Sequence, residues 1–142
     1  FMIKRMAVYN ITYKNKETEK LINDELGKAY NLFQKIKLSG IGSRRMIIEN
    51  FSADLSKLEM KVSGIQYANI EIRPKGIIVH INQGIYTHAW TIPFYHLNIY
   101  NGEYFTVHGA GSFIQFAKEK TWKENKNFLN KLITLKSNFN SV

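Results

Sequence analysis

The segment VHGAGSF, residues 107–113, combines residue types that serve two kinds of site. Two glycines one residue apart are typical of a phosphate-holding loop, and a histidine near a serine is typical of a hydrolase. A phosphate loop needs a helix directly after it, whereas Gly111 is followed by the strand-like residues SFIQFA. The Lys-Ser or Lys-Thr pair of a P-loop and the GxSxG nucleophile elbow are also absent. We therefore predict that Gly109-Ala110-Gly111 is a turn between two strands.

The chain has four histidines, His80, His88, His96 and His108, and clustered histidines can hold a metal ion or transfer protons. A three-residue turn at Asn82-Gln83-Gly84 would place His80 and His88 on one face of a hairpin, and a two-residue turn would place them on opposite faces. Residues 72–102 contain no carboxylate to orient a metal-bound histidine, and HExxH is absent. We predict no metal site, no cofactor and no catalytic histidine.

The other residues that carry chemistry form no recognisable site. The acids of residues 46–117 each occupy a polar strand or turn position, with nothing pairing them for acid–base work: Glu49, Asp54, Glu59, Glu71 and Glu103. The absence of cysteine excludes disulfides, thiol catalysis and thiolate zinc sites. The serines lack a nucleophile motif, so the sequence predicts a protein that is not an enzyme.

Positive charge is concentrated at the two ends of the chain, which carries a net charge of +9. Residues 1–45 hold ten basic and four acidic residues, residues 118–142 hold six and two, and the middle is nearly balanced. If the ends meet in space, they form one basic face that attracts nucleic acid, anionic lipid or an acidic protein. Helix lysines that merely keep the chain soluble are the alternative. The predicted anion-binding residues are Lys14, Lys16, Arg44, Arg45, Lys118, Lys120 and Lys123.

The length and hydropathy of the chain favour a single domain over residues 1–142. No run approaches the ~18 apolar residues of a membrane-spanning helix, and the N-terminus lacks a secretory signal. These features predict a cytoplasmic protein, with a domain cut from a longer chain as the alternative. The partner and the oligomeric state stay open.

Two amphipathic helices are predicted to flank a β region. Within an N-terminal extension of about 1–42, residues 17–38 place Leu21, Ile22, Leu26, Ala29, Tyr30, Phe33 and Ile36 on one apolar stripe, and Ser39-Gly40 ends this helix. A C-terminal helix of about 120–138 follows, with Thr121 as its N-cap and Glu124 as the capping-box partner.

The β region, about 44–117, changes to a period of two, with turns expected at Arg73–Gly76, Asn82-Gln83-Gly84 and Asn101-Gly102. A short strand is also expected before residue 17, within MAVYNITYK. The predicted strands cover 44–53, 58–65, 67–73, 76–82, 85–92, 96–100, 103–108 and 112–117, two of which can form one bent strand, making seven. The sequence thus predicts an α+β fold with a mainly antiparallel sheet.

Seven antiparallel strands followed by a helix with an aromatic and aliphatic face, here Trp122, Phe128, Leu129 and Leu132, resemble a bacterial pleckstrin-homology-like (PH-like) domain over about 44–139. The stretch GIIVHINQGIYTHAWTIPFYHLNIYNGEYFTVHGAGSFIQFA carries this resemblance. It implies a curved seven-stranded barrel or sandwich that binds a protein, a peptide or a lipid headgroup without catalysis. The alternatives are a binder of nucleic acid or an anionic surface through the basic ends, and a small enzyme or ligand-binding cone with His80 and His88 in one pocket.

Overall fold

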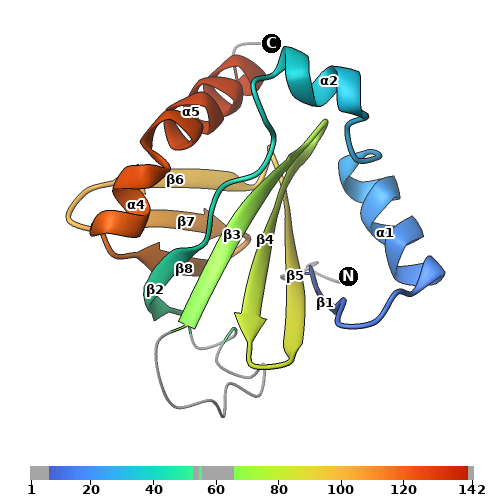
Figure 1. Cartoon of the computed structure of the whole chain (residues 1–142), viewed down its shortest axis with the longest axis horizontal. Helices are drawn as coiled ribbons and strands as arrows, with labels where there is room; N and C mark the ends of the chain where they lie inside the picture. The colour runs from blue at the N-terminus through green and yellow to red at the C-terminus, as the bar shows by residue number, and fades with distance from the viewer. Residues whose placement is uncertain (1–6, 53–54, 56–65, 141–142) are drawn as a thin grey trace.

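An eight-stranded antiparallel sheet lies at the centre of the computed structural model, which describes residues 7–52, 55 and 66–140 (Figure 1). Its strands are β1 (Ala7–Asn10), β2 (Met46–Phe51), β3 (Gln66–Arg73), β4 (Gly76–Gln83), β5 (Tyr86–Pro93), β6 (Leu97–Asn101), β7 (Phe105–Gly109) and β8 (Ser112–Phe116). They lie side by side in the order β1-β5-β4-β3-β2-β8-β7-β6. The predicted α+β class with an antiparallel sheet is confirmed, although these strands form an open sheet and not a closed barrel.

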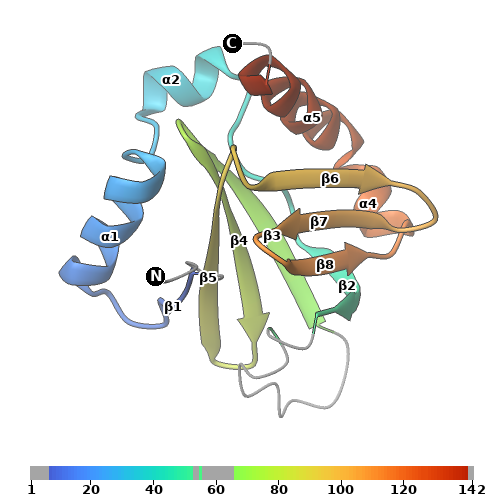
Figure 2. The same cartoon turned by 180° about the vertical axis from the view of Figure 1, so that it is seen from behind.

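The sheet has eight strands and not the predicted seven, because β1, the short strand expected near the N-terminus, pairs at its edge. β1 pairs with β5, with Ala7 opposite Thr91. The predicted strand 58–65 lies outside the described residues. Figure 2 shows β6, β7 and β8 running across the direction of β3, β4 and β5, and β2 joins the two groups by pairing with both β3 and β8.

The hairpin turns decide which side chains share a face. Arg73 pairs with Gly76 and Gly109 pairs with Ser112, so both of these predicted turns are confirmed. Ala110 and Gly111 take positive φ values of 50° and 88°, the conformation of a tight hairpin turn, which settles VHGAGSF as a turn. The predicted turn at Asn101-Gly102 also forms a hairpin, with three residues between the paired Asn101 and Phe105.

The main core fills the concave side of the sheet. Ile77, Val79 and Ile81 of β4 point into it, together with Trp90 and Ile92 of β5. The C-terminal helices cover this side, with Leu129 and Leu132 buried and Trp122 and Phe128 partly buried against the core, as the predicted apolar face requires. On the opposite face of β4 and β5, Ile78 and Ala89 pack with Ile22 and Leu26 in a smaller second core.

The predicted helix 17–38 is wrong as a single element, because the chain forms α1 (Lys16–Leu26) and α2 (Leu32–Lys37). Gly27 ends α1 with φ at 83°, and the turn after β3 binds the exposed carbonyls at that end. The Lys75 N–H donates to the Leu26 carbonyl at 2.9 Å, and the Arg73 guanidinium donates to the Gly27 carbonyl at 3.0 Å. Of the predicted stripe, Ile22 and Leu26 are buried, whereas Leu21, Phe33 and Ile36 are exposed.

The predicted helix 120–138 is also broken, into α4 (Lys120–Glu124) and α5 (Lys126–Asn140). Its predicted N-cap is wrong, because Glu119 occupies that position and accepts the Thr121 N–H at 2.9 Å. The buried Asn125 stands between the two helices. Among the described helices, none has the length and apolar character needed to cross a bilayer.

Candidate functional site

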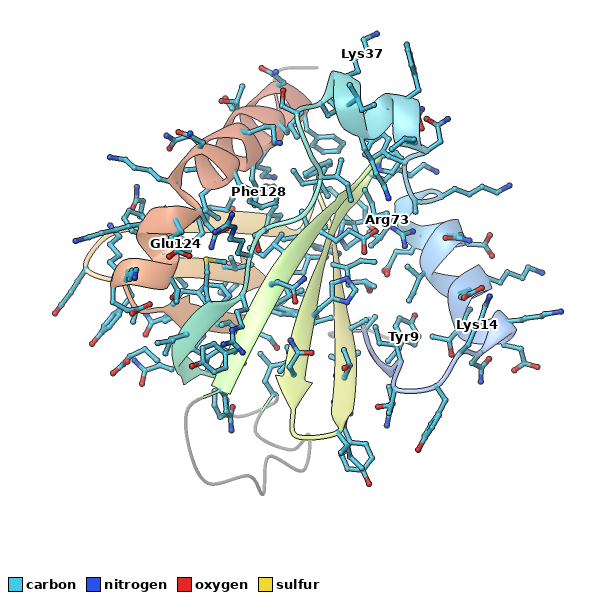
Figure 3. All side chains as sticks on the ribbon, in the orientation of Figure 1. Tyr9, Lys14, Lys37, Arg73, Glu124 and Phe128 are labelled. Carbon is cyan, nitrogen blue, oxygen red and sulfur yellow. The ribbon has the colours of Figure 1, made fainter. Side chains whose placement is uncertain are left out.

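A hollow of about 300 Å³ lies between α1 and the outer face of the sheet, and we call it the α1 hollow. Its apolar side is formed by Ile22 of α1, Ile78 of β4 and Ala89 of β5, which are all buried. The polar residues that line it are Lys14, Asn15, Thr18, Glu19, Arg73 and His80, with Ile11 and Tyr13 completing the wall. Figure 3 shows Lys14 near the start of α1 and Arg73 at the other end of that helix. Within α1 itself, Thr18, Glu19 and Ile22 line the hollow.

The register of the β3–β4 hairpin brings the polar groups of this face together. Glu71 pairs with Ile78 and Asn69 pairs with His80, so Glu71 and His80 are diagonal neighbours. Because side chains alternate along a strand, Arg73 points to the same outer face as Glu71. The short turn between Arg73 and Gly76 fixes this register and therefore fixes the site.

A hydrogen-bonded network holds these three side chains in place. Glu71 Oε1 lies 2.9 Å from His80 Nε2, and Glu71 Oε2 accepts the Arg73 Nε–H at 2.6 Å. Arg73 Nη1 also donates to Asn23 Oδ1 at 3.1 Å and to the Gly27 carbonyl at 3.0 Å. The network therefore ties β3 and β4 to the last turn of α1.

The electrostatic balance of the network keeps Glu71 ionised. Burial, the largest single influence, raises the pKa of Glu71, but the hydrogen bonds from His80 and Arg73 and the charges of both together lower it further. The pKa of Glu71 therefore lies below its ordinary value. An ionised carboxylate accepts hydrogen bonds and donates none, so His80 must donate from Nε2, and in the neutral imidazole Nδ1 is the acceptor.

This arrangement can bind a small molecule that has both apolar and polar parts. The apolar side would cover a hydrocarbon or ring surface, while Arg73, His80 and Lys14 offer hydrogen bonds and positive charge beside it. Among the described residues, no group of three or more His, Cys, Asp or Glu stands ready to hold a metal ion.

The four histidines are not brought together. Gln83 pairs with Tyr86 and Gly84 has φ at 62°, so β4 and β5 are joined by the two-residue turn, the second of the two turn lengths considered from the sequence. His80 and His88 consequently point to opposite faces of the sheet. The common pocket required by the enzyme or cone alternative is therefore not formed between these two residues.

The remaining histidines lie apart from the α1 hollow. His88 has Nδ1 buried without a hydrogen-bond partner among the described residues, and burial lowers the pKa of its imidazole. His96 is exposed, with its ring centroid 4.4 Å from that of Tyr95. The ring centroids of His108 and Tyr100 lie 6.4 Å apart in an edge-on arrangement.

Five of the seven predicted anion-binding residues gather where β2 meets α4, and we call them the β2–α4 basic cluster: Arg44, Arg45, Lys118, Lys120 and Lys123. The Arg45 guanidinium lies 4.3 Å from the centre of the Tyr67 ring, and Lys118 Nζ lies 5.0 Å from the centre of the Trp122 ring. Arg44 Nη1 lies 3.9 Å from a Glu124 carboxylate oxygen.

The other two residues, Lys14 and Lys16, lie at the start of α1. Figure 3 shows Lys14 and Glu124 of α4 on opposite sides of the molecule. The structure thus brings Arg44 and Arg45 of the N-terminal basic segment beside the C-terminal basic segment at α4. It leaves Lys14 and Lys16 apart from them, at the start of α1. Anion binding by either group stays a prediction.

The Glu71–Arg73–His80 network was missed by the sequence analysis. The sequence pattern predicts only a polar strand or turn position for Glu71, and the carboxylate-free segment 72–102 begins one residue after it. The predicted Arg73–Gly76 turn contains the information needed to locate this network, because it sets the register of β3 and β4. A two-residue turn there pairs Glu71 with Ile78 and therefore places His80 diagonally beside the carboxylate.

Comparison of this chain with models of known protein families, with curated proteins and with solved structures finds no match. We therefore infer its function from the geometry and charge of the described residues.

Proposed function

We propose that this chain is a non-enzymatic binding module of PH-like architecture, and that the α1 hollow holds a small ligand with an apolar body and a polar group. The seven consecutive antiparallel strands β2 to β8, followed by the amphipathic α5, support the architecture. Leucines of α5 pack into the concave side of the sheet, which leaves the outer face of β4 and β5 for α1.

One observation supports the binding proposal: buried apolar side chains and hydrogen-bonded polar side chains line the same hollow. Ligand sites are mostly apolar concavities of ~300–1,000 Å³ with a few placed polar groups, and the α1 hollow is at the lower end of that range. Arg73 and His80 are held by Glu71 before any ligand arrives. A ligand would therefore lose little free energy in ordering the protein.

The proposal is tested by screening small amphipathic fragments against ¹⁵N-labelled protein by NMR. We expect hits to shift the backbone amides of α1 and of β4 around His80. Thr18→Phe narrows the hollow that Thr18 lines and should abolish these hits. Lys20→Phe adds the same ring at an exposed α1 position outside the lining and should preserve them. Hits that survive in Thr18→Phe, or a screen that never moves these amides, would contradict the proposal.

A second candidate function is the binding of a nucleic acid strand by the β2–α4 basic cluster. The specific observation is that residues 44–45 and 118–123, two segments that together carry five cations, meet where the start of β2 contacts α4. The Arg44 side chain is 80% exposed, so its guanidinium is accessible to a phosphate. The salt dependence of oligonucleotide binding by the wild type and by Arg44→Ala/Arg45→Ala tests this function.

A further inference from the structure

The short helix α2 exposes three large apolar side chains to solvent. Leu32 is 74% exposed, Phe33 75% and Ile36 70%, and α2 buries none of its residues. Ile36 lies four positions after Leu32 and three after Phe33, so it is a neighbour of both on the helix surface. Neither of the two cores contains them. Exposed apolar side chains that are grouped in this way are typical of a surface that binds a membrane or another protein.

The position of α2 is fixed although its apolar residues are not buried. Asn31 and Gln34 form a capping box, with Asn31 Oδ1 accepting the Gln34 N–H at 2.9 Å and Gln34 Oε1 accepting the Asn31 N–H at 3.0 Å. At the other end, Lys131 Nζ of α5 donates to the carbonyls of Leu38 and Ser39 at 3.0 and 3.2 Å, and to that of Gly40. These hydrogen bonds therefore hold α2 in place beside the end of α5 (Figure 1).

The charged residues of the chain segment that contains α2 are all basic. Residues 26–48 contain no Asp or Glu, and they include Lys28, Lys35 and Lys37, which are all exposed. Figure 3 shows Lys37 on α2 reaching outward at the rim of the molecule. Apolar side chains surrounded by lysines are the combination that binds the headgroup region of an anionic bilayer.

We propose that α2 docks the protein on the surface of an anionic lipid bilayer. Leu32, Phe33 and Ile36 enter the boundary between headgroups and acyl chains, and Lys28, Lys35 and Lys37 lie against the lipid phosphates and carboxylates. The docking surface is separate from the α1 hollow, so this inference does not depend on the proposed small ligand.

Other occupants of the α2 surface fit less well. A second copy of the chain would bring Lys28, Lys35 and Lys37 of two molecules together, and three side chains supply far less than the ~800 Å² per partner of a stable interface. A nucleic acid strand gains affinity from aromatic stacking, which Leu32 and Ile36 cannot provide. A bilayer needs neither matched shape nor stacking.

The experiment is co-sedimentation with vesicles of phosphatidylcholine alone or of phosphatidylcholine mixed with phosphatidylserine, at low and at physiological salt. We expect binding to the anionic vesicles and little binding to the neutral ones. The triple variant Leu32→Ser/Phe33→Ser/Ile36→Ser should lose this binding. The matched control is Ile85→Ser/Tyr86→Ser, which removes exposed apolar side chains at the β4–β5 turn, away from α2, and should bind as the wild type does.

A second pair of variants tests the lysines. Lys35→Gln/Lys37→Gln should weaken binding by about fivefold per lysine. Lys14→Gln/Lys16→Gln removes the same charge at the start of α1 and should weaken binding far less. Phe33→Trp gives a direct signal, because bromine-labelled lipid should quench the fluorescence of the added indole if the side chain enters the bilayer. The unfolding temperature of every variant is measured, and the α2 variants should match the wild type because they replace exposed residues.

Three results would each overturn the docking proposal. They are no sedimentation with anionic vesicles at low salt, equal sedimentation of the triple serine variant, or quenching of vesicle-bound Phe33→Trp that does not exceed the quenching of the wild type. Self-association that the triple serine variant abolishes, in a chain that ignores vesicles, would assign α2 to a second copy instead. Thr18→Phe should leave vesicle binding unchanged, so failure of the small-ligand proposal and failure of this one are separable.

Discussion

The polar side of the α1 hollow depends on one residue, Glu71, whose carboxylate receives both His80 and Arg73. The pKa of Glu71 is lower in the folded protein than its ordinary value, so its ionisation contributes stability above the unfolded pKa. That contribution is lost as the pH falls from the ordinary value of 4.5 through the folded pKa. We expect Glu71→Gln to lower the free energy of unfolding at neutral pH by about 1–3 kcal/mol and to flatten its decline in acid. Urea denaturation at a series of pH values measures both effects.

The control for this prediction is Glu49→Gln, at an exposed position of β2. It should leave both the neutral-pH stability and the acid decline close to those of the wild type. Equal acid profiles for Glu71→Gln and the wild type would show that the Glu71 network does not contribute to stability.

The burial of His88 predicts a second effect of pH on stability, at higher pH than the effect of Glu71. Burial lowers the pKa of His88 below its ordinary value of 6.5, so the unfolded chain takes up the proton first as the pH falls. Stability should therefore decrease as the pH falls through 6.5 and level off below the folded pKa. His88→Leu should remove this decrease, which the unfolding temperature at pH ~7.5 and ~5.5 measures. His96→Leu, at an exposed position, is the control, and a decrease that persists in His88→Leu would contradict the prediction.

At the scale of elements, Asn125 joins the break between α4 and α5 to the start of β2. Its Oδ1 accepts the Arg44 N–H at 2.8 Å, and its Nδ2 donates to the carbonyls of Arg44 and Thr121 at 3.2 and 2.8 Å. Asn125→Ala leaves these groups without partners, and we expect a loss of about 1–3 kcal/mol in the free energy of unfolding. Chemical denaturation measures the loss, with the exposed Asn127→Ala as the control.

A continuous helix through residue 125 would give the opposite result, because alanine has the higher helix propensity and would stabilise the protein. The sign of the Asn125→Ala effect therefore distinguishes the two arrangements. Stabilisation of the variant would contradict the break.

Periodicity and turn residues predict the elements well, but they do not predict where long-range contacts interrupt them. The change of period near residue 45 locates the β region, and the turns at Pro74-Lys75 and Ala110-Gly111 form as expected. The break after Leu26 has local signals in the Gly27 cap and the Asn31–Gln34 capping box, and Arg73 and Lys75, which are distant in sequence, bind the end of α1. The break at Asn125 depends in the same way on Arg44.

At the scale of the whole molecule, the sequence predicts which residues are charged or apolar, and the topology decides which of them meet. His80 and Glu71 meet because β3 and β4 form a hairpin with a two-residue turn, while His88 is carried to the other face by an equally short turn. Lys14 and Lys16 stay apart from the β2–α4 basic cluster because α1 packs against β5, whereas α4 lies beside β2 on the other side of the molecule (Figure 2).

The final prediction concerns the β2–α4 basic cluster and its response to salt. If its five cations each neutralise one phosphate, affinity for a single-stranded oligonucleotide should fall by about 10²-fold between about 50 and 200 mM salt, through counterion release. Arg44→Ala/Arg45→Ala removes two of these contacts and should make the logarithmic salt dependence shallower by about 1.4. Lys14→Ala/Lys16→Ala removes the same charge at the distant α1 end and should preserve the slope. Fluorescence anisotropy measures each slope. Equal effects of the two double variants would indicate attraction by net charge alone, and no binding at low salt would leave the cluster as a solubilising surface.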